Sequence, residues 1–378
     1  MLKRDAAAFR SATGAQDGFA STVDLLWSNL SALGLTAFDW TATGVTGELP
    51  AARSTRLGTG ARLVQTQVSW SVAGDPAPAR QLIWLTLVPD DDSQAPLVVA
   101  TTDRPTTPTD PLPAPLWLLE PLRRTAGGRS TVIGGSGCDL ATWATVLDRA
   151  ARAVAQRVPA ALRPRWNQRL VAELPSNERL LEQVLGAASG SRTGIAAITW
   201  PESTEPVSAP LRIVINPAPV QNVSTLGIDV LATHEATHVA TRSPLSRAPL
   251  WLVEGYADWV AYDRWPAALD SALAPLLDEV AAGRGPTGLP VDADFDAGSA
   301  DLSRRYAEAW TACRFVAQSR GPATLATLYA AAQDADARDA DAVGEGAVQQ
   351  ALGESLGSFV RAWRADLDRQ AARRSGRR

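Results

Sequence analysis

The feature that most constrains the fold is a change of hydrophobic pattern near residue 137. Before it, short segments alternate apolar and polar residues, as half-buried β-strands do, and turn-rich stretches such as "AGDPAPA" (73–79) separate them. After it, apolar residues recur mostly at helical spacing. We therefore expect an α+β fold, and the length of 378 residues suggests two or three domains.

We expect the first domain to span residues 1–137. Residues 5–33 are rich in Ala and Leu and predict one or two helices. Strand-like segments follow at 35–43, 61–72, 80–90, 96–102 and 130–135. A helix followed by such a run predicts a curved antiparallel sheet packed against the helix. Trp40, Trp70 and Trp84 fall on the strand patterns, and we expect them to fill the core rather than to bind a ligand.

We expect the second domain to span residues 138–378. Residues 138–162 predict a long amphipathic helix, and the pattern after residue 224 is almost wholly helical. A small sheet is expected from the three apolar segments 168–175, 196–200 and 211–219. The Arg-rich tail, about residues 370–378, is expected to be disordered.

Composition narrows the classes of function. The formal net charge of −4 and the pI near 5.4 argue against a nucleic-acid partner, because no basic surface is available to neutralise phosphates. No apolar run is long enough to span a bilayer, and the first residues lack the apolar core of a signal peptide, so the chain as written is expected to be soluble, although an anchor can have been trimmed. Abundant Ala and Arg indicate a GC-rich, bacterial coding sequence.

The two cysteines exclude one kind of metal site. Cys138 and Cys313 are far apart in the sequence and show no CxxC spacing, which rules out a cysteine zinc site. They can be two free thiols or one disulfide, and both possibilities stay open.

Both histidines of the chain lie in "ATHEATHVAT" (232–241). Residues 227–241 fit a helix, on which positions i and i+4 share a face, so His234 and His238 can direct ring nitrogens at one ion. Glu235 projects to the side, where it can act on a water molecule without being a ligand. This is the mechanical meaning of H-E-x-x-H. The alternative is a helix that carries two histidines with no metal.

A second segment, "PLWLVEGYADWVAY" (249–262), offers a further ligand. Catalytic zinc usually takes three protein ligands and a water molecule, and Glu254 is the natural third donor. Asp258 lies one helical turn later, where it can orient one of the histidines by accepting a hydrogen bond. Two free carboxylates in so apolar a segment would be costly, and a metal site would offset the cost.

H-E-x-x-H, a short loop and then W-L-x-E-G-x-A-D resemble the gluzincin zinc metallopeptidases, and in particular the compact branch called peptidase MA-like. The resemblance covers roughly residues 139–365, and the gap of fifteen residues between His238 and Glu254 is shorter than in the thermolysin and aminopeptidase branches. It implies a zincin-type metallopeptidase domain, with zinc held by His234, His238 and Glu254. On pattern alone, the first domain is similar to NTF2-like, cystatin-like domains.

The resemblance also implies a reaction, which is hydrolysis of a peptide bond in a peptide or protein substrate. Zinc would activate a water molecule, and Glu235 would act as the general base. Such families supply a downstream Tyr or His to the oxyanion, and Tyr306 is the candidate here, with a purely structural tyrosine as the alternative. We expect the strand at 211–217 to pair with an extended substrate, and the loop around Phe295 to line a side-chain pocket.

Other readings of the sequence stay open. The zinc can be structural, in a non-catalytic binding or scaffold protein, or the protein can be a protease that its own N-terminal domain inhibits. The resemblance implies an extracytoplasmic location, either secreted or tethered to a membrane, while a cytoplasmic location stays open. The oligomeric state does not follow from the sequence.

Overall fold

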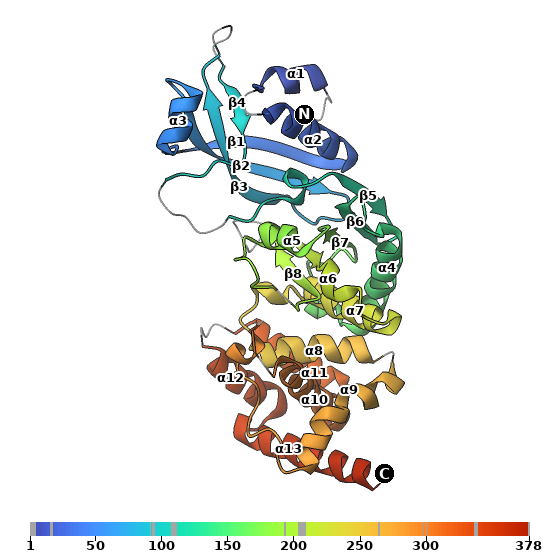
Figure 1. Ribbon diagram of the computed structural model, residues 1–378. Helices are drawn as coiled ribbons and strands as arrows, with labels where there is room; N and C mark the ends of the chain where they lie inside the picture. The colour runs from blue at the N-terminus through green and yellow to red at the C-terminus, as the bar shows by residue number, and fades with distance from the viewer. Residues whose placement is uncertain are drawn as a thin grey trace. The chain divides into compact units, whose positions relative to one another are not determined.

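The computed structural model describes residues 5–15, 18–90, 92, 95–106, 112–192, 194–202, 209–263, 265–296, 298–299, 301–335 and 339–376. They form α-helices and two β-sheets (Figure 1), which confirms the α+β class at this coarse level. Compact packing divides the chain into two units. Unit 1 comprises Met1–Thr145 and Arg169–Asn222, and unit 2 comprises Val146–Gln168 and Val223–Arg378.

The first sheet of unit 1 is antiparallel throughout. Its strands are β1 (Leu35–Gly47), β2 (Arg62–Val72), β3 (Ala79–Val88) and β4 (Leu97–Ala100), and they lie in chain order. Helix α2 (Phe19–Ala32) buries Leu26 and Leu30 in the same core as Trp70 of β2. Shorter helices accompany it, α1 (Ala6–Ser11) and α3 (Ala51–Leu57).

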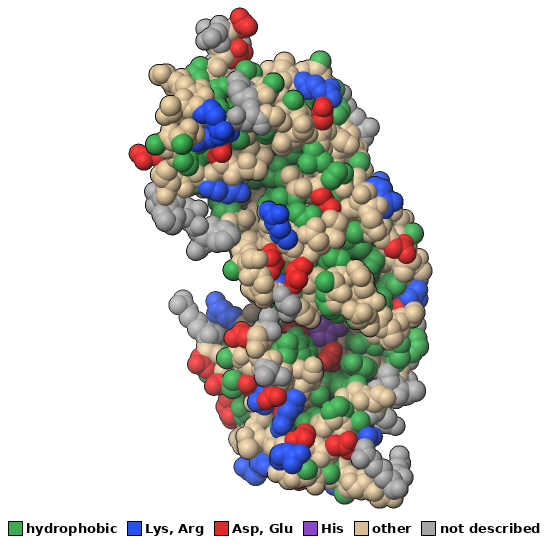
Figure 2. All heavy atoms as spheres, in the orientation of Figure 1, with side chains coloured by type: hydrophobic (Ala, Val, Ile, Leu, Met, Phe, Trp, Pro, Cys, Tyr) green, Lys and Arg blue, Asp and Glu red, His purple; other side chains and the backbone are tan. Residues whose placement is uncertain are grey.

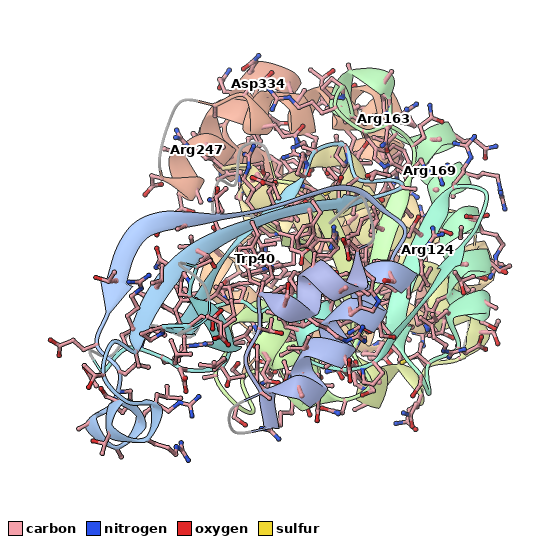
Figure 3. All side chains as sticks on the ribbon, turned by 90° about the horizontal axis from the view of Figure 1, so that it is seen from above. Trp40, Arg124, Arg163, Arg169, Arg247 and Asp334 are labelled. Atoms are coloured by element: carbon pink, nitrogen blue, oxygen red, sulfur yellow. The ribbon has the colours of Figure 1, made fainter. Side chains whose placement is uncertain are left out.

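The expected tryptophans pack as the alternation predicts. Trp70 and Trp84 are buried. Trp40, labelled in Figure 3, lies on β1 and is partly buried, and its indole nitrogen donates a hydrogen bond to Thr66 Oγ1 over 2.7 Å. Trp117, in the 3-10 helix η2 (Leu116–Leu118), stands edge-on to the rings of Trp40 and Trp70. Aromatic side chains therefore fill this core.

The second sheet has the order β5-β6-β7-β9-β8. Its strands are β5 (Leu122–Ala126), β6 (Ser130–Gly135), β7 (Leu170–Leu174), β8 (Ala197–Pro201) and β9 (Leu211–Ile215). Strands β6, β7 and β9 run parallel, and the two outer strands are antiparallel to their neighbours. Helix α4 (Leu140–Arg157) connects β6 to β7, as a parallel pair requires. Helices α5 (Glu178–Leu185) and α6 (Pro217–Val220) complete the unit.

The second sheet contains residues from both sides of position 137, where the sequence suggests a domain boundary. Residue 137 was expected to end the first domain, but β5 and β6, at 122–126 and 130–135, belong to the sheet that β7, β8 and β9 complete. Parallel pairing of β6 with β7 holds residues on both sides of position 137 in one unit. Residues 169–222 therefore group with the N-terminal part of the chain.

Unit 2 is helical over its described residues. Its long helices are α7 (Thr225–Thr241), α8 (Leu250–Tyr262), α9 (Pro266–Ala281), α10 (Leu302–Arg320), α11 (Pro322–Gln333), α12 (Ala340–Leu352) and α13 (Leu356–Ser375). The expectation of a disordered tail is wrong for residues 370–375, because they continue α13 and bury Ala371. Among the described residues, no helix combines the length and the apolar character needed to cross a bilayer.

An ion cluster is buried within unit 1. Arg212 of β9 pairs with Asp75 over 2.7 Å and with Glu173 over 2.8 Å, and it also contacts Glu202. All four side chains are at most 2% exposed, and the guanidinium carbon lies 3.8 Å from the ring centroid of Trp70. Three carboxyl groups thus surround one cation, out of reach of water.

Candidate metal centre

Helix α7 carries the two histidines and is well defined at both ends. Ser224 caps its start by accepting a hydrogen bond from Gly227 N, and the helix ends where Arg242 adopts a left-handed backbone conformation. Every residue from Ala232 to Thr241 is buried, including the histidines. The helix tolerates this burial because Thr233, Thr237 and Thr241 each donate to the carbonyl four residues earlier.

Helix α8 brings the third donor against α7. It follows Pro249, and nine of its residues are buried. At Gly255, directly after Glu254, a Cβ atom would lie 2.3 Å from the carbonyl oxygen of Ala309 in α10. Glycine therefore lets α8 approach α10 closely, and this approach fixes the depth at which Glu254 is held.

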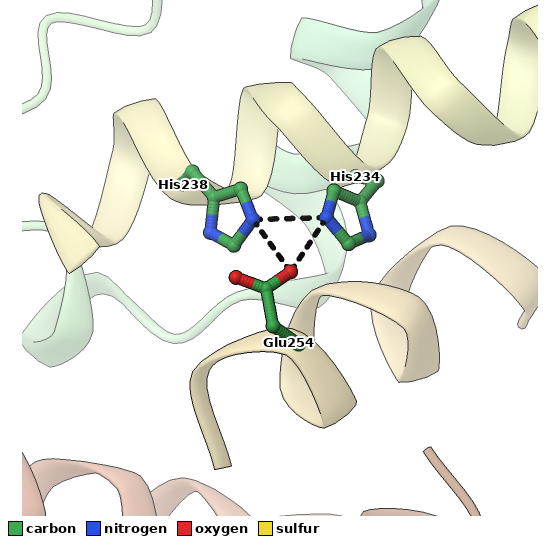
Figure 4. A group of neighbouring side chains, drawn as sticks. All are labelled: His234, His238 and Glu254. Atoms are coloured by element: carbon green, nitrogen blue, oxygen red, sulfur yellow. Dashed lines mark hydrogen bonds and ion pairs between the residues drawn. The ribbon is translucent and has the colours of Figure 1, made fainter. Parts of the chain in front are cut away.

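His234, His238 and Glu254 meet at one point (Figure 4). The Nε2 atoms of the two histidines lie 2.9 Å apart, and Glu254 Oε2 is 3.1 Å from His234 Nε2 and 3.4 Å from His238 Nε2. Donors placed tetrahedrally around zinc at 2.0–2.1 Å are roughly 3.3 Å apart, so the spacing suits such an ion. The three side chains are 9–13% exposed, and little of the purple histidine surface is visible in Figure 2.

Each histidine is held from its far side. His234 Nδ1 lies 2.8 Å from Asp258 Oδ1, and His238 Nδ1 lies 2.7 Å from Ser243 Oγ. An ionised carboxylate only accepts hydrogen bonds, so His234 donates from Nδ1 and keeps the lone pair of Nε2 for the centre. The structure thus places Asp258 where the sequence predicted an orienting group. Ser243 was not predicted, since a serine in a loop gives no signal of its own.

The donor set fits a divalent cation. With hydrogen on both Nδ1 atoms, two nitrogen lone pairs and a carboxylate oxygen face one another within 3.4 Å, an arrangement that only a positive charge between them relieves. Two imidazoles and one carboxylate are also a usual ligand set of catalytic zinc.

The directions of the pKa shifts of His234 and Glu254 also favour a cation at this centre. Burial alone would lower the pKa of His234, but the charge of Asp258 and the hydrogen bonds to Asp258 and Glu254 outweigh it and raise that pKa well above its ordinary value. Burial would likewise raise the pKa of Glu254, yet the imidazoles hold it far below its usual range. A point that attracts a proton so strongly also attracts a metal cation.

Tyr306 lies beside the three donors, and the charge of Glu235 acts on its hydroxyl. Tyr306 of α10 is hydrogen-bonded to Glu254, and its ring centroid is 6.2 Å from that of His234. Burial, followed by the charges of Glu254, Asp258 and Glu235, raises the pKa of Tyr306 well above its ordinary value, so its hydroxyl keeps its proton. Glu235 is buried on α7, next to His234.

Two further expectations have different outcomes. Phe295, in the 3-10 helix η6 (Asp292–Phe295), stands edge-on to Tyr306 with 5.4 Å between the ring centroids, and the side-chain pocket expected there stays a prediction. The expectation that the strand at 211–217 pairs with a substrate is wrong, because β9 is already paired on both sides, by β7 and by β8. Cys138 and Cys313 are free thiols.

Comparison with protein-family models gives no match, and comparison with curated proteins gives none either. The residues of the site and their geometry are therefore what indicates the function.

Proposed function

We propose that the protein is a zinc-dependent hydrolase of peptide bonds, most simply an endopeptidase of the gluzincin type. The observation that carries the proposal is the convergence of His234, His238 and Glu254 in one buried cluster, with Tyr306 beside it and a buried Glu235 on the helix of the two histidines. The zincin-type interpretation of the helical unit, and the NTF2-like interpretation of the antiparallel sheet, belong to the same proposal.

The side chains around the centre divide the work of hydrolysis. Zinc, when bound, polarises the scissile carbonyl and makes water a nucleophile near neutral pH. Glu235 takes a proton from the attacking water and passes it to the leaving amine. Tyr306 keeps its hydroxyl proton and can donate it in a hydrogen bond to the oxyanion. His234 and His238 bind and stay neutral, each donating from Nδ1 to its supporting residue.

Glu235 separates this proposal from its alternatives. A purely structural zinc site has no need of a buried carboxylate beside its ligands, and it would use a fourth protein ligand. Two histidines and a carboxylate are also the ligands of some iron oxygenases, but these do not need a general base on the ligand helix. We therefore favour the hydrolase over a scaffold protein.

The test is Glu235→Gln, which keeps the shape of the side chain and removes its basicity. We expect metal analysis of purified protein to find about one zinc ion per chain in both forms. Hydrolysis of an unstructured peptide library by the variant should fall by about 10²–10⁴-fold. Glu279→Gln is the matched control, because Glu279 is paired with Arg284 on the surface of α9 and should leave the rate unchanged.

Three results would reject the proposal. One is a Glu235→Gln variant that cleaves the library as fast as the wild type. Another is a wild-type protein that cleaves nothing when loaded with zinc, and the third is a purified protein that binds iron in preference to zinc.

A further inference from the structure

Behind His238 lies a series of buried hydroxyl groups that the reaction itself does not use. Ser243 Oγ lies 2.7 Å from His238 Nδ1, and Ser243 is also hydrogen-bonded to the Tyr329 hydroxyl. That hydroxyl lies 3.2 Å from Thr241 Oγ1, which in turn lies 2.9 Å from the carbonyl oxygen of Thr237. All five residues are buried, with at most 7% of each residue's surface exposed, so bulk water does not interrupt the series.

The last member fixes the direction of every hydrogen bond in the series. A carbonyl oxygen can only accept, so the Thr241 hydroxyl donates its single proton to Thr237 O. Thr241 Oγ1 must then accept from Tyr329, and Tyr329 must accept from Ser243. Because the Ser243 hydroxyl already donates its single proton to Tyr329, its oxygen can only accept a hydrogen bond from His238 Nδ1.

We propose that Ser243, Tyr329 and Thr241 form a directional hydroxyl relay that holds the proton of His238 on Nδ1 and so keeps Nε2 free to bind the metal. His234 obtains the same result from the Asp258 carboxylate. A lone serine cannot do so, because a hydroxyl can donate as well as accept. The relay removes that choice, and its three members are positioning residues. This inference rests on the proposed metal site.

Removing the Thr241 hydroxyl should reverse the direction of the hydrogen bonds between Tyr329, Ser243 and His238. In Thr241→Val the Tyr329 hydroxyl loses its acceptor and can turn toward Ser243, which then donates to His238 Nδ1. The ring proton moves to Nε2, where it competes with the metal. We expect the zinc affinity, measured by competition with a chelator, to fall about 10–100-fold. Thr241→Ser restores a hydroxyl at the same place and should restore the affinity.

A spectroscopic measurement tests the relay without metal or activity. The chain has only two histidines, so ¹⁵N-histidine labelling gives four ring-nitrogen signals. In the metal-free protein, at a pH where His238 carries a single proton, we expect that proton on Nδ1. It should move to Nε2 in Thr241→Val and in Tyr329→Phe, and it should stay on Nδ1 in Thr241→Ser.

Tyr256→Phe is the matched control. Its ring packs on that of Tyr329 with 4.5 Å between the centroids, and within the described part of the chain its buried hydroxyl has no hydrogen-bond partner. Removing this hydroxyl should change neither the zinc affinity nor the His238 spectrum. Tyr329→Phe perturbs the same core equally, so a difference between the two variants reports on the relay and not on packing.

The outcomes separate the relay from the proposed function. Wild-type His238 with its proton on Nε2 overturns the relay, as does a Thr241→Val variant whose spectrum and zinc affinity match those of the wild type. If the wild type binds no zinc while the spectra behave as expected, the metal proposal fails and the relay stands.

Discussion

Asp258 and Ser243 support the two histidines with groups of different strength. The hydrogen bond from His234 ends on a carboxylate, and such charge-assisted bonds are roughly twice as strong as neutral ones. The bond from His238 ends on a neutral hydroxyl that depends on further hydroxyls. His234 is thus oriented by charge and His238 by a network.

Asp258→Asn therefore should weaken metal binding at His234. The amide can present an N–H group to Nδ1, which favours a proton on Nε2, and we expect the zinc affinity to fall about 10–100-fold. Chelator competition measures the change. Asp263→Asn, at the end of the same helix, removes an exposed ion pair with Arg157 and should leave the affinity unaltered. Equal affinity of Asp258→Asn and wild type would contradict the assigned role.

Local spacing predicts the ligand residues but not the residues that support them. His234, His238, Glu254 and Asp258 follow from positions one helical turn apart on two apolar segments, and the structure brings all four together. The sequence does not predict the hydroxyl relay, because Tyr329 is 91 residues from His238. Only tertiary packing brings Tyr329 close to Ser243, which contacts His238. A tyrosine in an Ala-rich helix has the same pattern as an ordinary core residue.

At the scale of elements, the contact between α8 and α10 holds the centre in place. Gly255→Ala would force a methyl group against the backbone of Ala309, and relief requires the two helices to separate. We expect the free energy of unfolding to fall by about 1–3 kcal/mol. Because Glu254 is the adjacent residue, the zinc affinity should fall as well.

Urea denaturation and zinc titration measure the two effects of Gly255→Ala. Gly346→Ala is the control, since it lies in the exposed face of helix α12 with open space around it. That change should stabilise the protein by up to about 1 kcal/mol. If Gly255→Ala proves as harmless as Gly346→Ala, the close helix contact does not position the ligand.

The observed strands show which strands the hydrophobic pattern of the sequence identifies and which it misses. Alternation located β1, β2 and β3, but it missed β5, whose "LRRTA" buries only Leu122 on one face. The pattern also led to a wrong position for β9, which was expected at an open edge of the sheet and lies in its interior. All five residues of Leu211–Ile215 are buried, as is typical of an interior strand. The apolar residues of this segment are compatible with that position, but Arg212 argues against it, because an arginine seldom occupies such a strand without buried partners.

At the scale of the whole molecule, the Arg212 cluster makes stability depend on pH. Burial, opposed in part by the Arg212 charge, raises the pKa of Glu173, and it raises the pKa of Glu202 well above its ordinary value. A carboxyl whose pKa is raised by folding adds stability below its unfolded pKa, and this stability is lost as the pH rises through the folded value. Unit 1 should therefore lose stability from this cluster as the pH rises from about 4.5, the ordinary pKa of glutamate.

Glu202→Gln tests this dependence. The amide carries no charge at any pH, so the unfolding free energy of the variant should change less with rising pH than that of the wild type. Thermal or urea unfolding across the pH range supplies the comparison. Asp24→Asn, which removes an exposed ion pair with Arg10, should keep the wild-type slope. A Glu202→Gln profile parallel to that of the wild type would show that Glu202 is not the group responsible.

The division of the chain into units has a consequence for synthesis on the ribosome. Unit 1 needs Arg169–Asn222 to complete its second sheet, so synthesis must pass residue 222 before this unit can close. Residues 146–168 leave the exit tunnel early and must wait for helices made much later. A chain released at residue 137 would carry β5 and β6 without their parallel partner, with an unpaired strand edge open to aggregation. The nascent protein is therefore most vulnerable between the synthesis of β6 and that of β7.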